Sequence, residues 1–381
     1  MLCSRAPPFG LFGCCVMRVL RRATLALPAA LLIGPRGAAA APDEEGYRAL
    51  NRAVVEQVLL PGYRRFAEAT ANFAAQLDTL ARSPAEAAPL QAARQGFAET
   101  VLAWEGVQPI RLGPADLFSR HARIQSWPDP EEHVGRDLAA AIAAREPAVL
   151  EARPQGLGNV TVQGLPALER LLFGEDAAAR LAAGGAEAGY RAALLRTIGG
   201  NLATLARDIL AGWSTDEKPF AATLIAPRPP YAAPREATQD LFRLLRDTVR
   251  NVAIRKLERP LGGDPAAARS DLLEWRRSGL SGQAIQANLA LGRDMAVLGF
   301  APALEKAGEG ELAELLRRAF EQVVATAKDL PLPLKAAIAD PARRPLVVRL
   351  QREATVLLAL LAQRLPPVLD IRPGVTAPDG N

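Results

Sequence analysis

The chain has 381 residues, of which 46 are basic and 41 acidic, giving a formal net charge of +5. The excess lies in residues 1–40, which contain five arginines and no acidic residue, so residues 41–381 carry 41 charges of each sign. A neutral chain has no electrostatic attraction to nucleic acid or to anionic lipid, and we expect neither as a partner.

Residues 1–40 have the pattern of a secretory signal peptide. A basic stretch begins at Met17, an apolar run extends over residues 23–33, and Ala38 and Ala40 satisfy the small-residue rule for cleavage. We therefore expect Met17 to be the true start, cleavage after Ala40 and export to the periplasm or cell envelope. The apolar run is too short to cross a bilayer, so we expect no transmembrane segment in the mature chain.

All three cysteines precede the expected cleavage site, at positions 3, 14 and 15. A mature chain without cysteine cannot form a disulfide, a zinc–thiolate site or an iron–sulfur cluster. Cys14 ends a weak lipoprotein-type motif, but no basic and apolar leader of sufficient length precedes it. We therefore favour a chain without a lipid anchor.

Apolar residues recur at helical spacing along the mature chain, and no run of β-branched residues alternates as a strand would. The pattern predicts helices at about 46–81, 87–110, 131–145, 166–183, 187–213, 235–258, 265–278, 281–300, 309–329 and 342–366. Pro61 and Gly62 predict a kink or a break in the first of them.

A proline-rich segment, residues 215–234, interrupts this pattern and separates two sets of long helices. Four or so long amphipathic helices close most readily as an up-and-down bundle. We therefore predict an all-α fold class with two four-helix-bundle-like domains, residues 41–214 and 235–381, joined by this linker.

The connection after the helix predicted at 87–110 is longer than a bundle turn requires. It contains Arg111, Arg123, Trp127 and Asp129, and Trp104 lies on the helix before it. Aromatic and charged residues in a long connection are typical of a binding surface, although a lid packed over the bundle end would use the same residues.

Residues 163–174 begin an apolar helix that contains the sequence Gly164-x-Pro166-x-x-Glu169. This segment resembles the Gly-x-His-x-x-Glu signature of the imelysin family, with Pro166 in the position of the histidine. Other segments resemble that family in the same order, at 102–108, 111–114, 123–129, 275–289 and 365–381. The last of them ends in Asp379-Gly380-Asn381, where the family has Asp-Gly-Asp.

The resemblance covers nearly the whole mature chain and implies a two-domain helical protein of the bacterial cell envelope. The family includes iron-regulated proteins tied to iron uptake and an insulin-cleaving membrane protease. The resemblance also implies a set of candidate ligand-binding residues around the motif and the long connection: Gly164, Pro166, Glu169, Arg111, Arg123, Trp104, Trp127 and Asp129.

Pro166 argues against metal-dependent catalysis, because it cannot replace the imidazole as a ligand and a catalytic zinc uses about three protein ligands. His121 and His133 are the only histidines, and neither has a partner at recognised ligand spacing apart from the acidic residues beside His133. We expect no catalytic residue and no cofactor, while a carboxylate-bound iron or other metal stays open.

Two interpretations of Glu169 remain. Proline is favoured in the first turn of a helix and a carboxylate near that turn stabilises the helix dipole, so the motif could be only a helix start. Alternatively, Glu169 is a ligand-binding carboxylate. The sequence favours a non-catalytic protein that binds a small ligand or an outer-membrane iron-uptake partner. A metallopeptidase with replacement ligands and a structural envelope protein are the alternatives.

Overall fold

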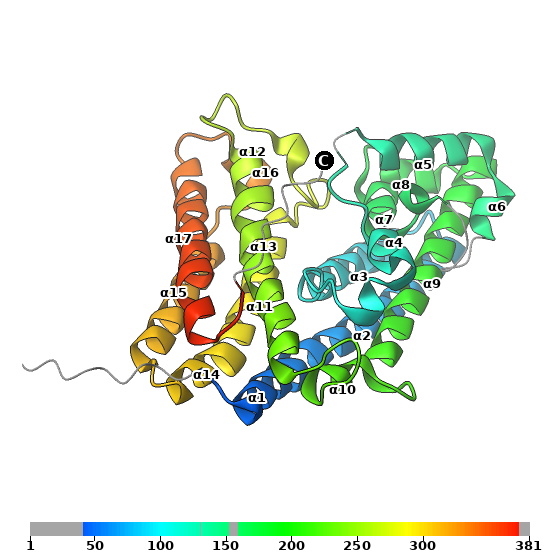
Figure 1. Ribbon diagram of the computed structural model, residues 1–381. Helices are drawn as coiled ribbons and strands as arrows, with labels where there is room; N and C mark the ends of the chain where they lie inside the picture. Colours follow the sequence, from blue (N-terminus) through cyan, green and yellow to red (C-terminus); the bar gives the residue numbers. More distant parts are fainter. Residues whose placement is uncertain (1–40, 130, 152–158, 373–381) are drawn as a thin grey trace, which may run out of the picture. The chain divides into compact units, whose positions relative to one another are not determined.

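The computed structural model describes residues 41–129, 131–151 and 159–372, and every regular element within these ranges is helical (Figure 1). This confirms the all-α fold class. The expected signal peptide and the closing Asp379-Gly380-Asn381 lie outside the described residues. Within the described ranges, no helix combines the length and the apolar content that a bilayer crossing requires.

The first half of the chain supplies a group of four helices: α2 (Leu60–Arg82), α3 (Ala87–Glu105), α7 (Gly164–Phe173) and α9 (Gly185–Ser214). Both α2 and α7 pack against α3 and α9. Helices α2 and α9 approach closely at Gly199, where an added Cβ atom would lie 2.6 Å from Leu77 Cδ1. Because the interior is densely packed, a larger residue at this position would push the two helices apart.

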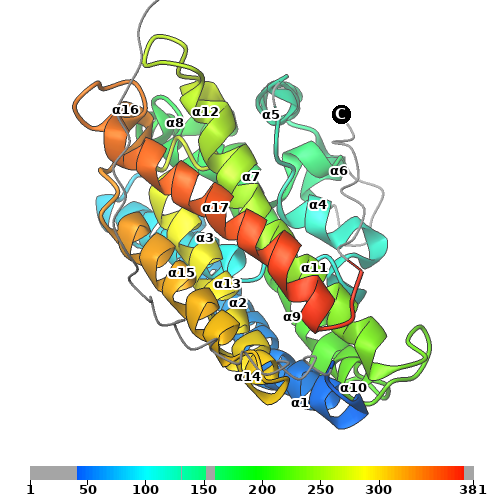
Figure 2. The ribbon, with the colours of Figure 1, turned by 60° about the vertical axis from the view of Figure 1, so that its left-hand side comes forward.

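The second half supplies another group of four: α11 (Pro234–Arg250), α13 (Ser281–Met295), α15 (Gly310–Lys328) and α17 (Arg344–Val368). They lie side by side (Figure 2), and both α11 and α15 contact α13 and α17. The sequence of α17 explains its packing, because its buried residues recur at intervals of three and four along one face. These include Val347, Leu350, Ala354, Leu357, Leu361 and Leu365.

Three of the helical stretches contain π-helical residues just before a proline. The π-helical residues are Val55–Leu59, Asn251–Glu258 and Ala296–Phe300, and the prolines follow at positions 61, 260 and 302. Proline has no N–H for the carbonyl four residues earlier, and its ring crowds that carbonyl. Widening the helix there relieves the conflict. Pro61 therefore distorts the first predicted helix but does not break it, because α1 (Glu44–Val54) continues through the π turn into α2.

The proline-rich segment 215–234 contains a short helix, α10 (Phe220–Ile225), which contacts α1, α9 and α11. Helix α1 also contacts α11 directly. Between these elements, Asn51 Nδ2 donates to the carbonyl oxygens of Leu224 at 3.0 Å and Pro234 at 2.9 Å. The two-domain division at this segment stays a prediction.

The prediction of a helix at 265–278 is wrong. This segment contains one short 3₁₀ turn, Ser270–Leu272, followed by turns that lead to α13. The helix predicted at 166–183 is two helices, α7 and α8, separated at Gly174. The shorter helices are α4 (Arg120–Ile124), α5 (His133–Ala144), α6 (Pro147–Leu150), α8 (Ala177–Ala182), α12 (Arg259–Leu261), α14 (Ala301–Lys306) and α16 (Leu334–Ala337).

Candidate functional site

A lysine and two glutamates form a buried charged group, which we name the inner cluster. Lys256 Nζ lies 2.6 Å from Glu105 Oε2 and 2.5 Å from Glu274 Oε2. Glu105 ends α3, Lys256 lies among the π-helical residues before Pro260, and Glu274 lies in the turns that precede α13. None of the three side chains is more than 3% exposed. The inner cluster therefore joins the two halves of the chain through one buried ammonium group.

Neutral side chains complete the hydrogen bonds of the inner cluster. Trp275 Nε1 donates to Glu105 Oε1 at 2.7 Å, and Asn288 Nδ2 donates to Glu105 Oε2 at 3.0 Å. Gln125 Nε2 donates to Glu274 Oε1, and Gln125 Oε1 accepts from Trp104 Nε1. Trp104, a predicted site residue, thus supports the cluster through Gln125.

The inner cluster holds one proton more than its formal charges suggest. Burial and the neighbouring Glu105 carboxylate together raise the pKa of Glu274 to about 8, although Lys256 acts in the opposite direction. Burial lowers the pKa of Lys256, but the two carboxylates outweigh it and raise that pKa above its ordinary value. The raised pKa favours the protonated form of Glu274 at neutral pH, which reduces the number of charges buried together.

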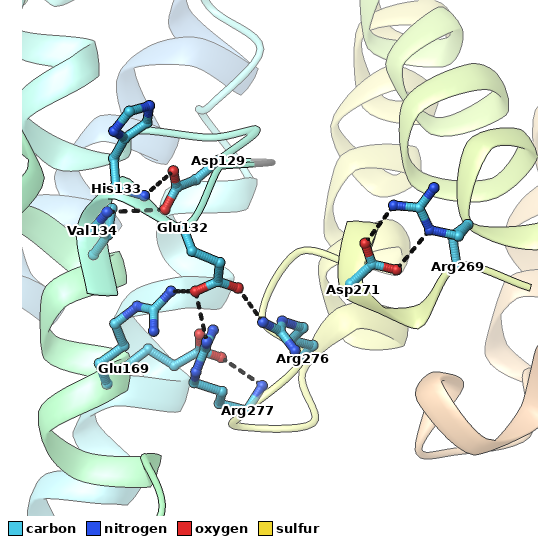
Figure 3. Close-up of polar contacts among 10 residues, drawn as sticks. Asp129, Glu132, His133, Val134, Glu169, Arg269, Asp271, Arg276 and Arg277 are labelled. Carbon is cyan, nitrogen blue, oxygen red and sulfur yellow. Dashed lines mark hydrogen bonds and ion pairs between the residues drawn. The ribbon is translucent and has the colours of Figure 1, made fainter. Parts of the chain in front are cut away.

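A second set of charges, which we name the outer cluster, lies nearer the surface. Glu132 forms ion pairs with Arg170, Arg276 and Arg277, the last at 3.2 Å (Figure 3). Partial burial acts to raise the pKa of Glu132, but the hydrogen bond from Arg170 and the three guanidinium charges lower it. Arg276 and Arg277 lie in the segment that was predicted as helix, so its irregular backbone brings both guanidinium groups to one carboxylate.

Glu169 fastens the same segment from the other side. Glu169 Oε1 accepts from the backbone N–H of Arg277 at 3.2 Å, from that of Ser278 at 2.9 Å and from Ser278 Oγ at 2.7 Å. The side chain is buried and lies beyond the first turn of α7, which begins at Gly164. The helix-start interpretation of Glu169 is therefore wrong, because this carboxylate binds a loop of the second half and does not complement the dipole of its own helix.

Gly164 is required by the backbone at the start of α7. Its φ is +68°, and an added Cβ atom would lie 2.3 Å from the carbonyl oxygen of Ile124 and 2.4 Å from that of Arg123. Only glycine adopts this conformation without strain and leaves room for the connecting segment. Gly164 thus positions residues 123–125, and with them Gln125 of the inner cluster.

The cavity beside Glu169 is small, at about 60 Å³. Four predicted site residues line it: Trp127, Asp129, Pro166 and Glu169. Asp129 caps α5, because its two carboxylate oxygens accept from the backbone N–H groups of His133 at 2.8 Å and Val134 at 3.0 Å. The surroundings of Glu169 are thus a nearly filled polar junction with room for a few water molecules.

The two predicted arginines lie away from this junction. Arg111 Nη1 lies 3.6 Å from Asp116 Oδ1, and Arg123 Nε donates to the carbonyl oxygen of Phe118 at 3.4 Å. Neither is paired with Glu169 or Asp129 in the described part of the chain. Arg111 instead lines a second, larger cavity, which Trp127 also lines.

The residues around the motif do not fit a catalytic metal. Pro166 has no donor atom, and one oxygen of Glu169 already accepts three hydrogen bonds. The neighbouring carboxylates are already engaged, because Glu132 pairs with three arginines and Asp129 accepts two backbone N–H groups. Among the described residues, no three His, Cys, Asp or Glu side chains are grouped so that they could hold a metal ion.

Lys256, Glu105 and Glu274 were not predicted as site residues from the sequence, and Glu132 was considered only as an acidic neighbour of His133. A signal for Lys256 existed, because it occupies an apolar face between Val252 and Leu257. A charged residue on such a face indicates a buried partner of opposite sign. No comparable signal marked Glu132, because two of its three partners, Arg276 and Arg277, come from a segment without helical geometry.

Comparisons with known proteins agree with this architecture. The sequence profile of a family described as Imelysin, which is designated a peptidase family, matches residues 59–361. No curated protein matches the chain.

Two solved structures share the fold. An imelysin-like protein from Psychrobacter arcticum is 22% identical with a TM-score of 0.73, and the match covers 87% of this chain and 98% of that one. A protein described as an iron-regulated protein A precursor, from Parabacteroides distasonis, is 16% identical with a TM-score of 0.70, covering 84% and 95%. At these identities the likeness concerns the fold.

Proposed function

The chain belongs to the imelysin family, and we propose that it is a non-catalytic ligand- or partner-binding protein of the bacterial cell envelope that serves iron uptake. The observation that carries the proposal is the use of Glu169. In the family signature this carboxylate accompanies a histidine, whereas here it accompanies Pro166 and binds the loop at Arg277 and Ser278. A carboxylate used in this way holds two parts of the protein together.

Electrostatics supports a binding role over hydrolysis. A metallopeptidase needs about three metal ligands and an open coordination position for water. The junction at Glu169 offers guanidinium groups and a cavity of about 60 Å³, which is far smaller than the volume of a peptide substrate. No observation on the described residues favours replacement ligands for a catalytic metal.

The link to iron uptake and to the envelope rests on two indications. The structure resembles a protein described as an iron-regulated protein A precursor, and residues 1–40 have the pattern of a signal peptide. An exported protein without catalytic residues would contribute by holding a ligand or by docking onto a partner at the envelope.

The test is a metal and protease assay on the mature chain, residues 41–381, purified from periplasm. We expect no stoichiometric zinc and no cleavage of unfolded casein with or without a chelator. Stoichiometric zinc together with chelator-sensitive proteolysis would overturn the non-catalytic proposal.

A second arm concerns iron. A strain that lacks the gene should grow more slowly than its parent when iron is limiting, and at the same rate when iron is plentiful. Equal growth under both conditions, or a defect that does not depend on iron, would overturn the link to iron uptake and favour a structural envelope role.

A further inference from the structure

The larger cavity on the other side of Trp127 is basic. It has a volume of about 290 Å³ and is lined by residues of the connection after α3, of α11 and of the π-helical turns that follow. Its lining contains five basic side chains and two carboxylates, Asp240 and Asp247. The basic side chains are Arg111, Arg243, Arg250, Arg255 and Lys256.

The two carboxylates are already engaged within the protein. Asp240 Oδ1 pairs with Arg243 Nη1 at 2.8 Å and Asp240 Oδ2 accepts from Tyr231 at 2.9 Å. Asp247 Oδ1 accepts from Arg246, a side chain outside the cavity lining, at 3.0 Å. Carboxylates outside the lining balance two of its cations, because Glu105 and Glu274 pair with Lys256 and Asp116 pairs with Arg111. Within the described residues, the positive charge that stays without a counter-ion is that of Arg255.

Arg255 shows this excess most directly. It has neither a hydrogen-bond nor an ion-pair partner within the described part of the chain, and it is only half-exposed. Burial is the main cause that lowers the pKa of Arg111, the Asp116 carboxylate acts in the opposite direction, and the positive charge of Arg255 adds a smaller lowering. Both guanidinium groups line the cavity, so an anion bound between them would interact favourably with each.

The histidine of the lining does not supply such an anion. His121 is buried beside the cavity, and its Nε2–H donates to the carbonyl oxygen of Gln108 at 2.8 Å. Burial, followed by the charge of Arg111, lowers the pKa of His121 to about 4, so the imidazole is neutral at physiological pH. The cavity thus presents guanidinium donors and a neutral imidazole.

We propose that this cavity binds a small polycarboxylate anion, held between the connection after α3 and α11. Guanidinium groups bind carboxylates through paired hydrogen bonds, and the arginines here come from separate elements. An anion with two or more spaced carboxylates can reach both elements, whereas a monocarboxylate reaches one. The inference rests on the proposed binding function, for which it names the ligand class.

The test is calorimetric titration of the mature chain with citrate at low ionic strength, with acetate and inorganic phosphate as comparison anions. We expect citrate to bind at one site, at least roughly tenfold more tightly than acetate or phosphate, and to weaken as salt is added. Equal binding of phosphate would show a general oxyanion site and would overturn the polycarboxylate assignment. No binding of any of the three would overturn the inference as a whole.

Variants locate the site. Arg255→Gln should weaken citrate binding roughly tenfold, because one charge-assisted pair is lost, and it should leave the melting temperature unchanged because Arg255 has no internal partner. Arg318→Gln removes an exposed guanidinium on α15, outside the cavity, and should change neither property. Equal loss of binding in both variants, or loss in neither, would overturn the assignment to this cavity.

The outcomes separate this inference from the proposed function. An iron-dependent growth defect without citrate binding would leave the function standing and remove the ligand class. If Arg255→Gln weakens citrate binding as expected, but the strain that lacks the gene grows like its parent when iron is limiting, the cavity assignment stands and the link to iron uptake is removed.

Discussion

The inner and outer clusters join the same two halves of the chain with the same kinds of charge, but they differ in exposure. The carboxylate of Glu132 in the outer cluster is 43% exposed, whereas Glu105 and Lys256 in the inner cluster are 0% and 3% exposed. Water screens the outer charges, so each of those ion pairs contributes little to stability. The inner charges have no such screening, and each depends on its partner.

The two clusters thus give the junction between the halves of the chain a fixed part, the inner cluster, and an adaptable part, the outer cluster. In the inner cluster the buried ion pair between Lys256 and Glu105 fixes the position of α3 against the helix that carries Lys256. In the outer cluster three guanidinium groups converge on one carboxylate, so individual pairs can break and form again in water. If the two halves of the chain move relative to each other, we therefore expect the ion pairs of the outer cluster to break before those of the inner cluster.

The largest expected effect is on the inner cluster. Lys256→Met removes the ammonium and leaves two buried acidic groups without a cation, which should lower the free energy of unfolding by about 3–5 kcal/mol. Urea denaturation at pH 7 measures this loss. Lys328→Met, at an exposed position on α15, is the control and should change stability by less than about 0.5 kcal/mol. A similar small loss for both variants would show that the inner cluster is not a buried charge group.

An intermediate effect concerns the proton on Glu274. The folded chain retains this proton up to about pH 8, whereas the unfolded chain releases it near its ordinary value of 4.5. The folded state thus binds more protons, and its stability should fall by about 2 kcal/mol as the pH rises from 6 to 8. Glu274→Gln, which mimics the protonated acid, should remove this fall in denaturation curves recorded across that range. An unchanged pH dependence in the variant would mean that Glu274 is ionised at neutral pH.

The smallest effect belongs to the outer cluster. Glu132→Gln should lower the free energy of unfolding by about 1 kcal/mol or less, because the carboxylate is partly exposed. Since the arginines lower the pKa of Glu132, its contribution is present above its ordinary pKa and is lost as the pH falls. Glu131→Gln alters a neighbouring, more exposed carboxylate and serves as the control. A loss as large as that of Lys256→Met would remove the distinction between the two clusters.

Most of the helical framework could be predicted from apolar spacing. The spacing of Val347, Leu350 and Leu357 marks one buried face of α17, and the same kind of pattern marks α2, α9 and α15. A helix that buries one face can be predicted because the spacing of its apolar residues is a local property of the sequence.

The segment 265–278 could not be predicted in this way. Its apolar residues have helical spacing, yet its backbone is fixed by distant side chains: Glu169 binds the N–H groups at 277 and 278, and Glu105 binds the indole of Trp275. Such partners lie more than a hundred residues away in the chain. Helical propensity is a weak preference that tertiary contacts of this kind override.

Pro260 has a consequence for how the buried ammonium finds its partners. Lys256 precedes it by four residues, so the backbone carbonyl that the pyrrolidine ring crowds is that of Lys256. One residue added to a helical turn changes the direction of a side chain by about 100°. The direction in which the Lys256 side chain leaves its helix thus depends on the backbone crowding at Pro260. A substitution of Pro260 alone would therefore change the direction of the Lys256 side chain and separate it from its carboxylate partners.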